Sequence, residues 1–147
     1  MQEKRKQQIA AYYDYWFEVN ALYEKWAKQH GLTAHALFAL YTIREYPEAC
    51  TQRLICDMLQ LPKQTIGAIL DTFEKKGYLE KEVMESDRRN KRIVLTEKGK
   101  AYAEGILSEL YRFEMAALDG MKEEEIRGLL TGGQRLREEM VRVLKKE

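Results

Sequence analysis

The side chains in this chain that are best suited to bind a charged partner form a short basic run. Four of the five residues 88–92 are Arg or Lys, and Asp87 precedes them. The flanking segments 79–83 and 93–95 have the residue types of short strands, and two such strands with a polar connection predict a β-hairpin. A hairpin tip that carries Arg and Lys can enter a narrow, negatively charged minor groove of DNA.

The segment before the hairpin predicts a two-sided helix from Pro62 to Lys76, closed by Gly77. Its apolar face carries Ile66, Ile69, Leu70 and Phe73, and the opposite face carries Gln64, Ala68, Asp71 and Lys75. The second face is narrow near the helix start, which suits insertion into a major groove. The alternative is an ordinary amphipathic surface helix, but the basic hairpin directly after it favours DNA binding. Together the two elements predict a winged helix-turn-helix.

Five further helices are expected around this pair of elements. A long helix over 4–29 ends at Gly31, and Thr33 and Thr51 are good N-caps for helices over 34–45 and 52–59. Thr96 caps a long helix over 97–118, and a last helix follows a turn at 119–120. The pair Gly132-Gly133 is expected to interrupt that last helix. The terminal helices have more apolar surface than the small middle part needs, which favours a second copy of the chain as partner.

The composition is that of an ordinary globular protein. The 147 residues are 45% hydrophobic and 33% charged, enough for one compact domain. Because no apolar run approaches the ~18–20 residues of a membrane span and no signal peptide is apparent, we expect a cytoplasmic protein without a membrane partner. The net charge of +1 is low for a nucleic-acid binder, but a local positive footprint matters more than the sum.

The sequence gives little support to an enzyme, and neither a cofactor nor a metal is expected. No nucleophile–base motif or phosphate-binding glycine loop stands out, and His30 and His35 are too few for a metal site. Cys50 and Cys56 are expected to be reduced. Helical geometry leaves Cys56 partly exposed, but no obvious cationic neighbour favours its thiolate, so redox sensing has little support.

The chain resembles the MarR (multiple antibiotic resistance regulator) family over nearly its whole length. The segment from Asp87 to Gly99 is similar to the family's wing signature, Asp-x-Arg followed by an apolar strand and Leu-Thr-x-x-Gly. Segments 61–66 and 73–79 are similar to the start and end of its recognition helix. The resemblance implies a mainly α fold with a small β-hairpin wing and a single MarR-like domain over 1–147. Residues 32–96 would be the winged helix-turn-helix DNA-binding part, flanked by dimerisation helices in 1–31 and 97–147.

The resemblance also implies a function and roles for the wing residues. A homodimer would bind double-stranded, pseudo-palindromic operator DNA as a ligand-responsive transcriptional repressor. Arg89 would enter the minor groove, and Asp87 would orient it or a neighbour through a charge-assisted hydrogen bond. Arg88 and Lys91 would contact phosphates, which position the protein without specifying sequence.

On the recognition helix, the expected DNA-binding residues are Lys63 for phosphate and Gln64 and Thr65 for base edges. Ala68 lies on the same face, at a position where many family members carry Arg. Thr72 stands at a position where they often carry a second Arg. Losing those cations should weaken major-groove electrostatics, so recognition here is expected to depend more on Gln64, Thr65 and the wing.

Family members usually release DNA when a small, often phenolic, molecule binds a cleft between the dimerisation and DNA-binding parts. Residues of this chain that could line such a cleft are Tyr12, Tyr13, Trp16, Leu37, Tyr41 and Tyr111. The same aromatic side chains would serve equally in a core or a subunit interface. A different class of function also stays open, namely a protein-interaction dimer whose winged helix does not read DNA sequence.

Overall fold

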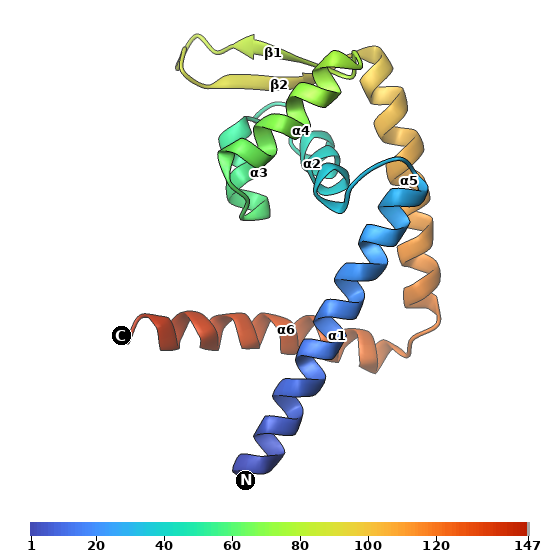
Figure 1. Cartoon of the computed structure of the whole chain (residues 1–147), viewed down its shortest axis with the longest axis vertical. Helices are drawn as coiled ribbons and strands as arrows, with labels where there is room; N and C mark the ends of the chain where they lie inside the picture. Colours follow the sequence, from blue (N-terminus) through green and yellow to red (C-terminus); the bar gives the residue numbers. More distant parts are fainter. Residues whose placement is uncertain (147) are drawn as a thin grey trace. The chain divides into compact units, whose positions relative to one another are not determined.

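The computed structural model describes residues 1–146 and confirms the mainly α fold with a small β-hairpin. This part of the chain contains six helices and two strands (Figure 1). The chain forms two compact units, residues 1–106 and 107–147. None of the helices within residues 1–146 is long and apolar enough to cross a bilayer.

Local capping chemistry sets the first three helices, α1 (Gln2–Gln29), α2 (Ala34–Glu45) and α3 (Gln52–Leu59). Gly31, just beyond α1, has a φ of +76°, the left-handed conformation that glycine adopts without strain. The hydroxyl of Thr33 accepts a hydrogen bond from the Ala36 amide, and that of Thr51 accepts one from the Leu54 amide, each at 3.1 Å. Both predicted N-caps are therefore confirmed, whereas α1 begins two residues earlier than expected.

The fourth helix, α4 (Lys63–Lys75), begins one residue later than the sequence suggests. Pro62 has an extended ψ of 151° and is the N-cap residue, so it stands before the helix and not in its first turn. The fixed φ of proline is compatible with either position, and only ψ distinguishes them. Gly77 follows the helix with a φ of +78° and turns the chain into the hairpin.

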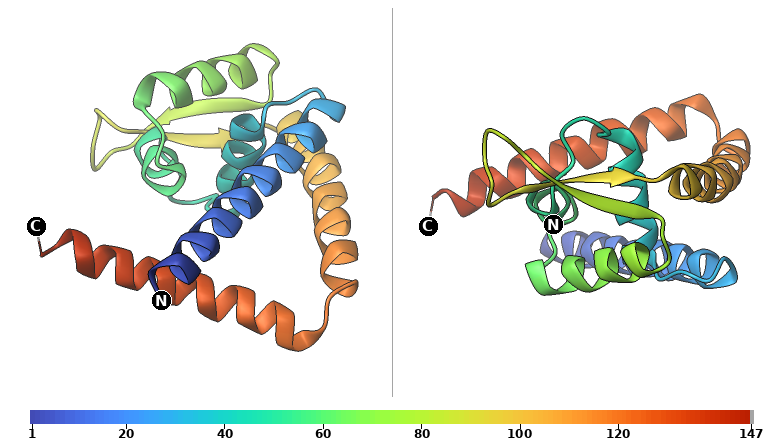
Figure 2. Two further views of the ribbon diagram at one scale, coloured as in Figure 1. Left: turned by 60° about the horizontal axis from the view of Figure 1, so that its bottom comes forward. Right: turned by 90° about the horizontal axis from the view of Figure 1, so that it is seen from above.

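The hairpin consists of β1 (Leu79–Val83) and β2 (Lys91–Leu95), which pair antiparallel from Leu79 opposite Leu95 to Val83 opposite Lys91. The second strand starts two residues earlier than its apolar part because Lys91 and Arg92 also pair with β1. Within the first unit, α2 contacts α1, α3, α4 and β2, and α4 contacts β1 (Figures 1 and 2).

A single hydrophobic core holds this first unit together. It draws one or more side chains from each of α2, α3, α4 and the two strands, all fully or almost fully buried: Leu37, Leu40, Ile43, Ile55, Ile66, Leu70, Phe73, Leu79 and Ile93. Burying each such side chain contributes roughly 1.5–3 kcal/mol. Because the recognition helix and the hairpin share this core, their outward-facing residues are presented from one rigid platform.

The last two helices are α5 (Glu97–Asp119) and α6 (Glu123–Leu144). The hydroxyl of Thr96 accepts a hydrogen bond from the Gly99 amide at 3.0 Å, which confirms it as the cap of α5. The predicted interruption of the last helix is wrong, because α6 runs without a break through Gly132 and Gly133. Each glycine costs about 1 kcal/mol in a helix, but ion pairs from Arg135 to Glu138 and Glu139 support the turn that follows them.

Candidate nucleic-acid interface

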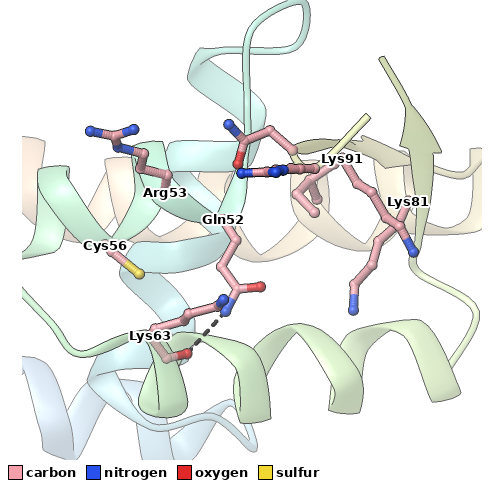
Figure 3. A pocket seen from close by; sticks show the side chains of 9 residues that line it. Gln52, Arg53, Cys56, Lys63, Lys81 and Lys91 are labelled. Carbon is pink, nitrogen blue, oxygen red and sulfur yellow. Dashed lines mark hydrogen bonds between the residues drawn. The ribbon is translucent and has the colours of Figure 1, made fainter. Parts of the chain in front are cut away.

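A basic pocket lies where α3, the start of α4 and the hairpin meet (Figure 3). Its volume is about 470 Å³, and its lining residues are Gln52, Arg53, Cys56, Lys63, Lys81, Arg89, Asn90, Lys91 and Ile93. Three of the predicted DNA-binding residues, Lys63, Arg89 and Lys91, therefore come together here. The described residues that line the basic pocket include five cations and no carboxylate.

Gln52 joins the two helices that flank the basic pocket. Its Nε2 donates a hydrogen bond of 3.0 Å to the main-chain carbonyl of Lys63, the first residue of α4 (Figure 3). A Cβ at Gly67 would lie 3.2 Å from the same nitrogen, so the glycine leaves room for this amide. The bond fixes the start of α4 against α3, and with it the position of Gln64 and Thr65.

At the tip of the wing, Asp87 shapes the backbone that carries Arg89. Its Oδ1 accepts a hydrogen bond of 3.0 Å from the Arg89 main-chain amide, and its Oδ2 accepts one of 2.9 Å from Nδ2 of Asn90. The carboxylate therefore holds the turn and not the Arg89 guanidinium. Within residues 1–146 that guanidinium takes part in no ion pair, and the side chain is exposed.

Arg92 differs from the other cations of the basic run because its ion pairs stabilise the fold. Its guanidinium forms ion pairs with Glu82 across the hairpin at 2.7 Å and with Glu48 before α3 at 3.2 Å. The hydrogen bond and the charge of Glu82, followed by the charge of Glu48, raise the pKa of Arg92. Nearby, the Ile93 amide donates a 2.7 Å hydrogen bond to the Cys50 carbonyl. The base of the wing is thus fastened to the segment that leads into α3.

A second ion pair joins the wing to the recognition helix. Nζ of Lys81 in β1 lies 3.2 Å from the carboxylate of Asp71 in α4. The acidic residue on the predicted DNA-facing side of α4 is therefore compensated by a cation of the wing. On the same helix Gln64 and Ala68 are exposed and Thr65 is half-buried, while the Thr72 hydroxyl donates to the Ala68 carbonyl at 3.0 Å.

Arg88 lies apart from the basic pocket although its neighbour in sequence lines it. It borders a separate hollow of the hairpin with Val83, Met84 and Glu85. Both arginines lie in the turn between the strands, and the two adjacent side chains border different hollows. Arg88 therefore does not line the basic pocket with Lys91, and its phosphate role stays a prediction.

The residues predicted to line an effector cleft have several different environments. Tyr12, Tyr13 and Trp16 form an exposed group of contacting rings on α1, with Tyr12 and Trp16 stacked at 6.3 Å between centroids. Tyr41 is exposed beside Arg44, whose guanidinium carbon lies 5.9 Å from the ring centroid. Leu37, in contrast, is fully buried in the core, so this conformation gives a small molecule no access to it. Tyr111 is exposed and belongs to the second unit.

The sequence reasoning missed Gln52, Arg53 and Lys81 as residues of the basic pocket. Their convergence depends on how α3 and β1 pack, and the sole local signal was that Gln52 and Arg53 open a short helix directly before the predicted recognition helix. Cys56 also lines the basic pocket, so the expectation that it has no cationic neighbour is wrong. Cys50 is fully buried, and this burial raises the pKa of its thiol to about 11.

Comparisons with known proteins identify the class of this interface. Residues 30–90 match a sequence model of the MarR family. The MarR family regulator NMB1585 from Neisseria meningitidis is 26% identical, with 97% of each chain covered and a TM-score of 0.77. Another MarR family transcription regulator of known crystal structure is 19% identical over 99% of this chain and 96% of its own, with a TM-score of 0.83.

A structure of a complex between S. aureus MepR and DNA shares the fold as well. It is 20% identical and covers 89% of this chain and 96% of its own, with a TM-score of 0.73. The hairpin that follows α4 is accordingly the wing of a winged-helix DNA-binding fold. The family model and the MarR regulators that share this fold agree with the resemblance that the wing signature indicated.

Proposed function

We propose that the protein is a sequence-specific regulator of transcription that binds double-stranded operator DNA. The observation that carries this proposal is the convergence of Lys63 from α4 with Arg89 and Lys91 from the wing on one basic pocket. The exposed start of α4 presents Gln64 to a major groove, while Arg89 reaches the adjacent minor groove. The MepR–DNA complex, which has the same fold, supports DNA as the partner.

The proposed active form is a homodimer on a pseudo-palindromic operator. Large apolar side chains are exposed on α1, including Trp16 at 46% and Phe17 at 60%, and α6 exposes Leu130 at 66%. Surfaces of this kind are normally covered by a partner, and a second copy of the same chain is the most economical one. A two-fold symmetric dimer would then match a two-fold symmetric DNA site.

The proposed mode of control is repression that a small aromatic or phenolic effector relieves. The exposed rings of Tyr12, Tyr13, Trp16 and Tyr41 offer stacking surface and hydroxyl groups to such a molecule. An effector can shift the DNA equilibrium only if it binds the DNA-free conformation more tightly than the bound one. Leu37 would become part of this site only if its surroundings opened.

The decisive experiment is selection of bound sequences from random duplex DNA at physiological salt, followed by footprinting of the selected site. We expect a pseudo-palindrome protected over two half-sites about 10–10.5 base pairs apart or a multiple of that spacing. A protein that enriches no sequence would instead be the protein-interaction dimer. Sedimentation tests the dimer separately, and a stable monomer at micromolar concentration would contradict it.

Control by an effector is tested on the selected site. A panel of simple phenols is titrated into the protein–DNA complex, and release of the DNA is followed by fluorescence anisotropy. We expect at least one phenol to release DNA from the wild-type protein. A higher concentration of that phenol should be needed to release DNA from Trp16→Ala, provided that this variant remains a dimer. If none of the phenols releases the DNA, this class of effector is excluded.

A further inference from the structure

We propose that the basic pocket seats the phosphate backbone of the DNA strand that separates the two grooves, with Arg53 as a phosphate contact. This inference rests on the proposed function, since it names how the same interface holds its DNA. Arg53 lies on α3, outside the recognition helix and the wing. It would be a positioning contact, because phosphate contacts fix register and orientation without carrying sequence information.

Charge is the first argument for this assignment. Among the five cations that line the basic pocket, Lys81 is paired with Asp71, whereas Arg53, Lys63, Arg89 and Lys91 make no ion pair within residues 1–146. The nearby carboxylate of Asp87 is occupied by the Arg89 amide and the Asn90 side chain. Cations that converge without a counter-charge repel one another, so the arrangement favours an anionic partner.

The geometry of DNA is the second argument. Adjacent major and minor grooves of a duplex are separated by one sugar–phosphate strand. If α4 enters the major groove and the tip of the wing enters the next minor groove, that strand must pass between them. The basic pocket lies at this place, with Lys63 from α4 on one side and Lys91 from the hairpin on the other (Figure 3). Arg89 lines it as well.

The third argument is that hydrogen bonds hold the backbone segments around the basic pocket in place. Gln52 fixes the start of α4 through the Lys63 carbonyl, and Asp87 fixes the turn at Arg89. Ile93, which is fully buried in the core, also lines the basic pocket. The backbones that carry Arg53, Lys63 and Arg89 are therefore held in place before DNA arrives, and their long side chains have only their own rotamers to order.

The first test compares salt dependence in Arg53→Gln and wild type. The logarithm of the binding constant is plotted against the logarithm of salt concentration for operator DNA and for random-sequence DNA. Removing one phosphate contact should lower the slope by about 0.9 and weaken binding about three- to tenfold at physiological salt on both DNAs. Lys28→Gln, an exposed charge at the end of α1 outside the basic pocket, is the matched control and should leave the slope unchanged.

The outcomes separate this inference from the proposed function. If the wild type prefers a site but Arg53→Gln keeps the wild-type slope, the phosphate role of Arg53 is refuted and the regulator stands. If the protein prefers no site but the slope still falls, the basic pocket stands and sequence-specific regulation fails. A wild type that binds no DNA overturns both. Circular dichroism and thermal unfolding of each variant confirm that it is folded.

The second test asks whether DNA physically occupies the basic pocket. Cys56 lines it and is half-buried, whereas Cys50 is fully buried and serves as an unreactive background. A maleimide probe should label wild-type protein once, and Cys56→Ser should abolish this labelling. Saturating DNA should slow the labelling of Cys56 at least several-fold. An unchanged labelling rate in a complex shown to be formed would exclude a DNA strand from this place.

Discussion

The carbonyl oxygen of Tyr78 lies against the α-carbon of Gly99, so closely that a Cβ at position 99 would overlap it. Thr96 secures the same junction, because its amide donates a 3.1 Å hydrogen bond to the Tyr78 carbonyl and its hydroxyl donates a 2.6 Å bond to the Gly77 carbonyl. The ring of Tyr102 stacks on that of Tyr78 at 4.1 Å. The first turn of α5 is thereby fixed to the segment between the recognition helix and the wing.

Gly99→Ala should therefore destabilise the protein by about 1–3 kcal/mol or more, because the overlap is with rigid backbone and not with a flexible side chain. Urea unfolding followed by tryptophan fluorescence measures the effect. Gly105→Ala in the same helix is the matched control, since a Cβ there meets nothing within 4 Å, and it should gain up to about 1 kcal/mol in helix propensity. Equal effects of the two changes would show that the Tyr78 contact is unimportant.

Arg92→Gln tests whether Arg92 holds the wing in place without touching DNA. Losing its ion pairs with Glu82 and Glu48 should loosen the hairpin and weaken operator binding several-fold, while the salt slope stays at the wild-type value. The free energy of unfolding should fall only slightly, because ion pairs that water can reach contribute little to stability. Lys91→Gln, one residue away, should lower the slope by about 0.9 because it removes a phosphate contact. Equal slopes for the two variants would mean that Arg92 also contacts DNA.

Features of the fold that depend on neighbouring residues could be predicted from the sequence. A threonine hydroxyl that caps a helix accepts a hydrogen bond from the main-chain amide three residues later, so the interaction is local. The starts of the helices after Thr33, Thr51 and Thr96 were therefore predicted correctly. The prediction that the glycine pair interrupts α6 was wrong because it considered the two glycines without their neighbours. Ion pairs in the turns after it support the helix, and their contribution is invisible in the two glycines themselves.

The candidate site could be predicted only as far as its charges follow one another along the chain. The basic run 88–92 was evident in the sequence, but its residues take different roles. Arg92 pairs with Glu48, 44 residues away in the sequence, and Arg88 borders a hollow separate from the basic pocket. Arg53 and Lys81 join the basic pocket only through the packing of α3 and β1. Such convergence is a property of tertiary structure, which no periodicity in the sequence encodes.

Arg89→Ala should weaken binding to the selected operator by roughly 1–3 kcal/mol, the scale of one good groove contact. The loss should be larger on the operator than on random DNA, because minor-groove readout depends on sequence. Arg88→Ala removes the same charge from the neighbouring position and should weaken binding to both DNAs alike. Fluorescence anisotropy at fixed salt gives the four binding constants. An equal loss of affinity for operator and random DNA in Arg89→Ala would mean that Arg89 contacts a phosphate and not the minor groove.

Burial of Cys50 makes the stability of the protein depend on alkaline pH. Its thiol has a pKa of about 11 in the folded protein, against an ordinary value of 9.0. The unfolded chain therefore loses this proton first as the pH rises. The stabilisation is fully present below pH 9 and is lost progressively between about pH 9 and 11, with a limit of about 3 kcal/mol.

The corresponding measurement is the free energy of unfolding between pH 8 and 10.5 for wild type and Cys50→Ala. The alanine variant should start lower, because it leaves a small cavity, but should fall less steeply with pH. Tyr102, whose pKa is also raised by burial, adds a loss of the same sign to both proteins, so the difference between the curves isolates Cys50. Cys56→Ala separates the effect of burial from that of losing a thiol. Parallel curves for wild type and Cys50→Ala would mean that the Cys50 thiol titrates alike in the folded and unfolded chain.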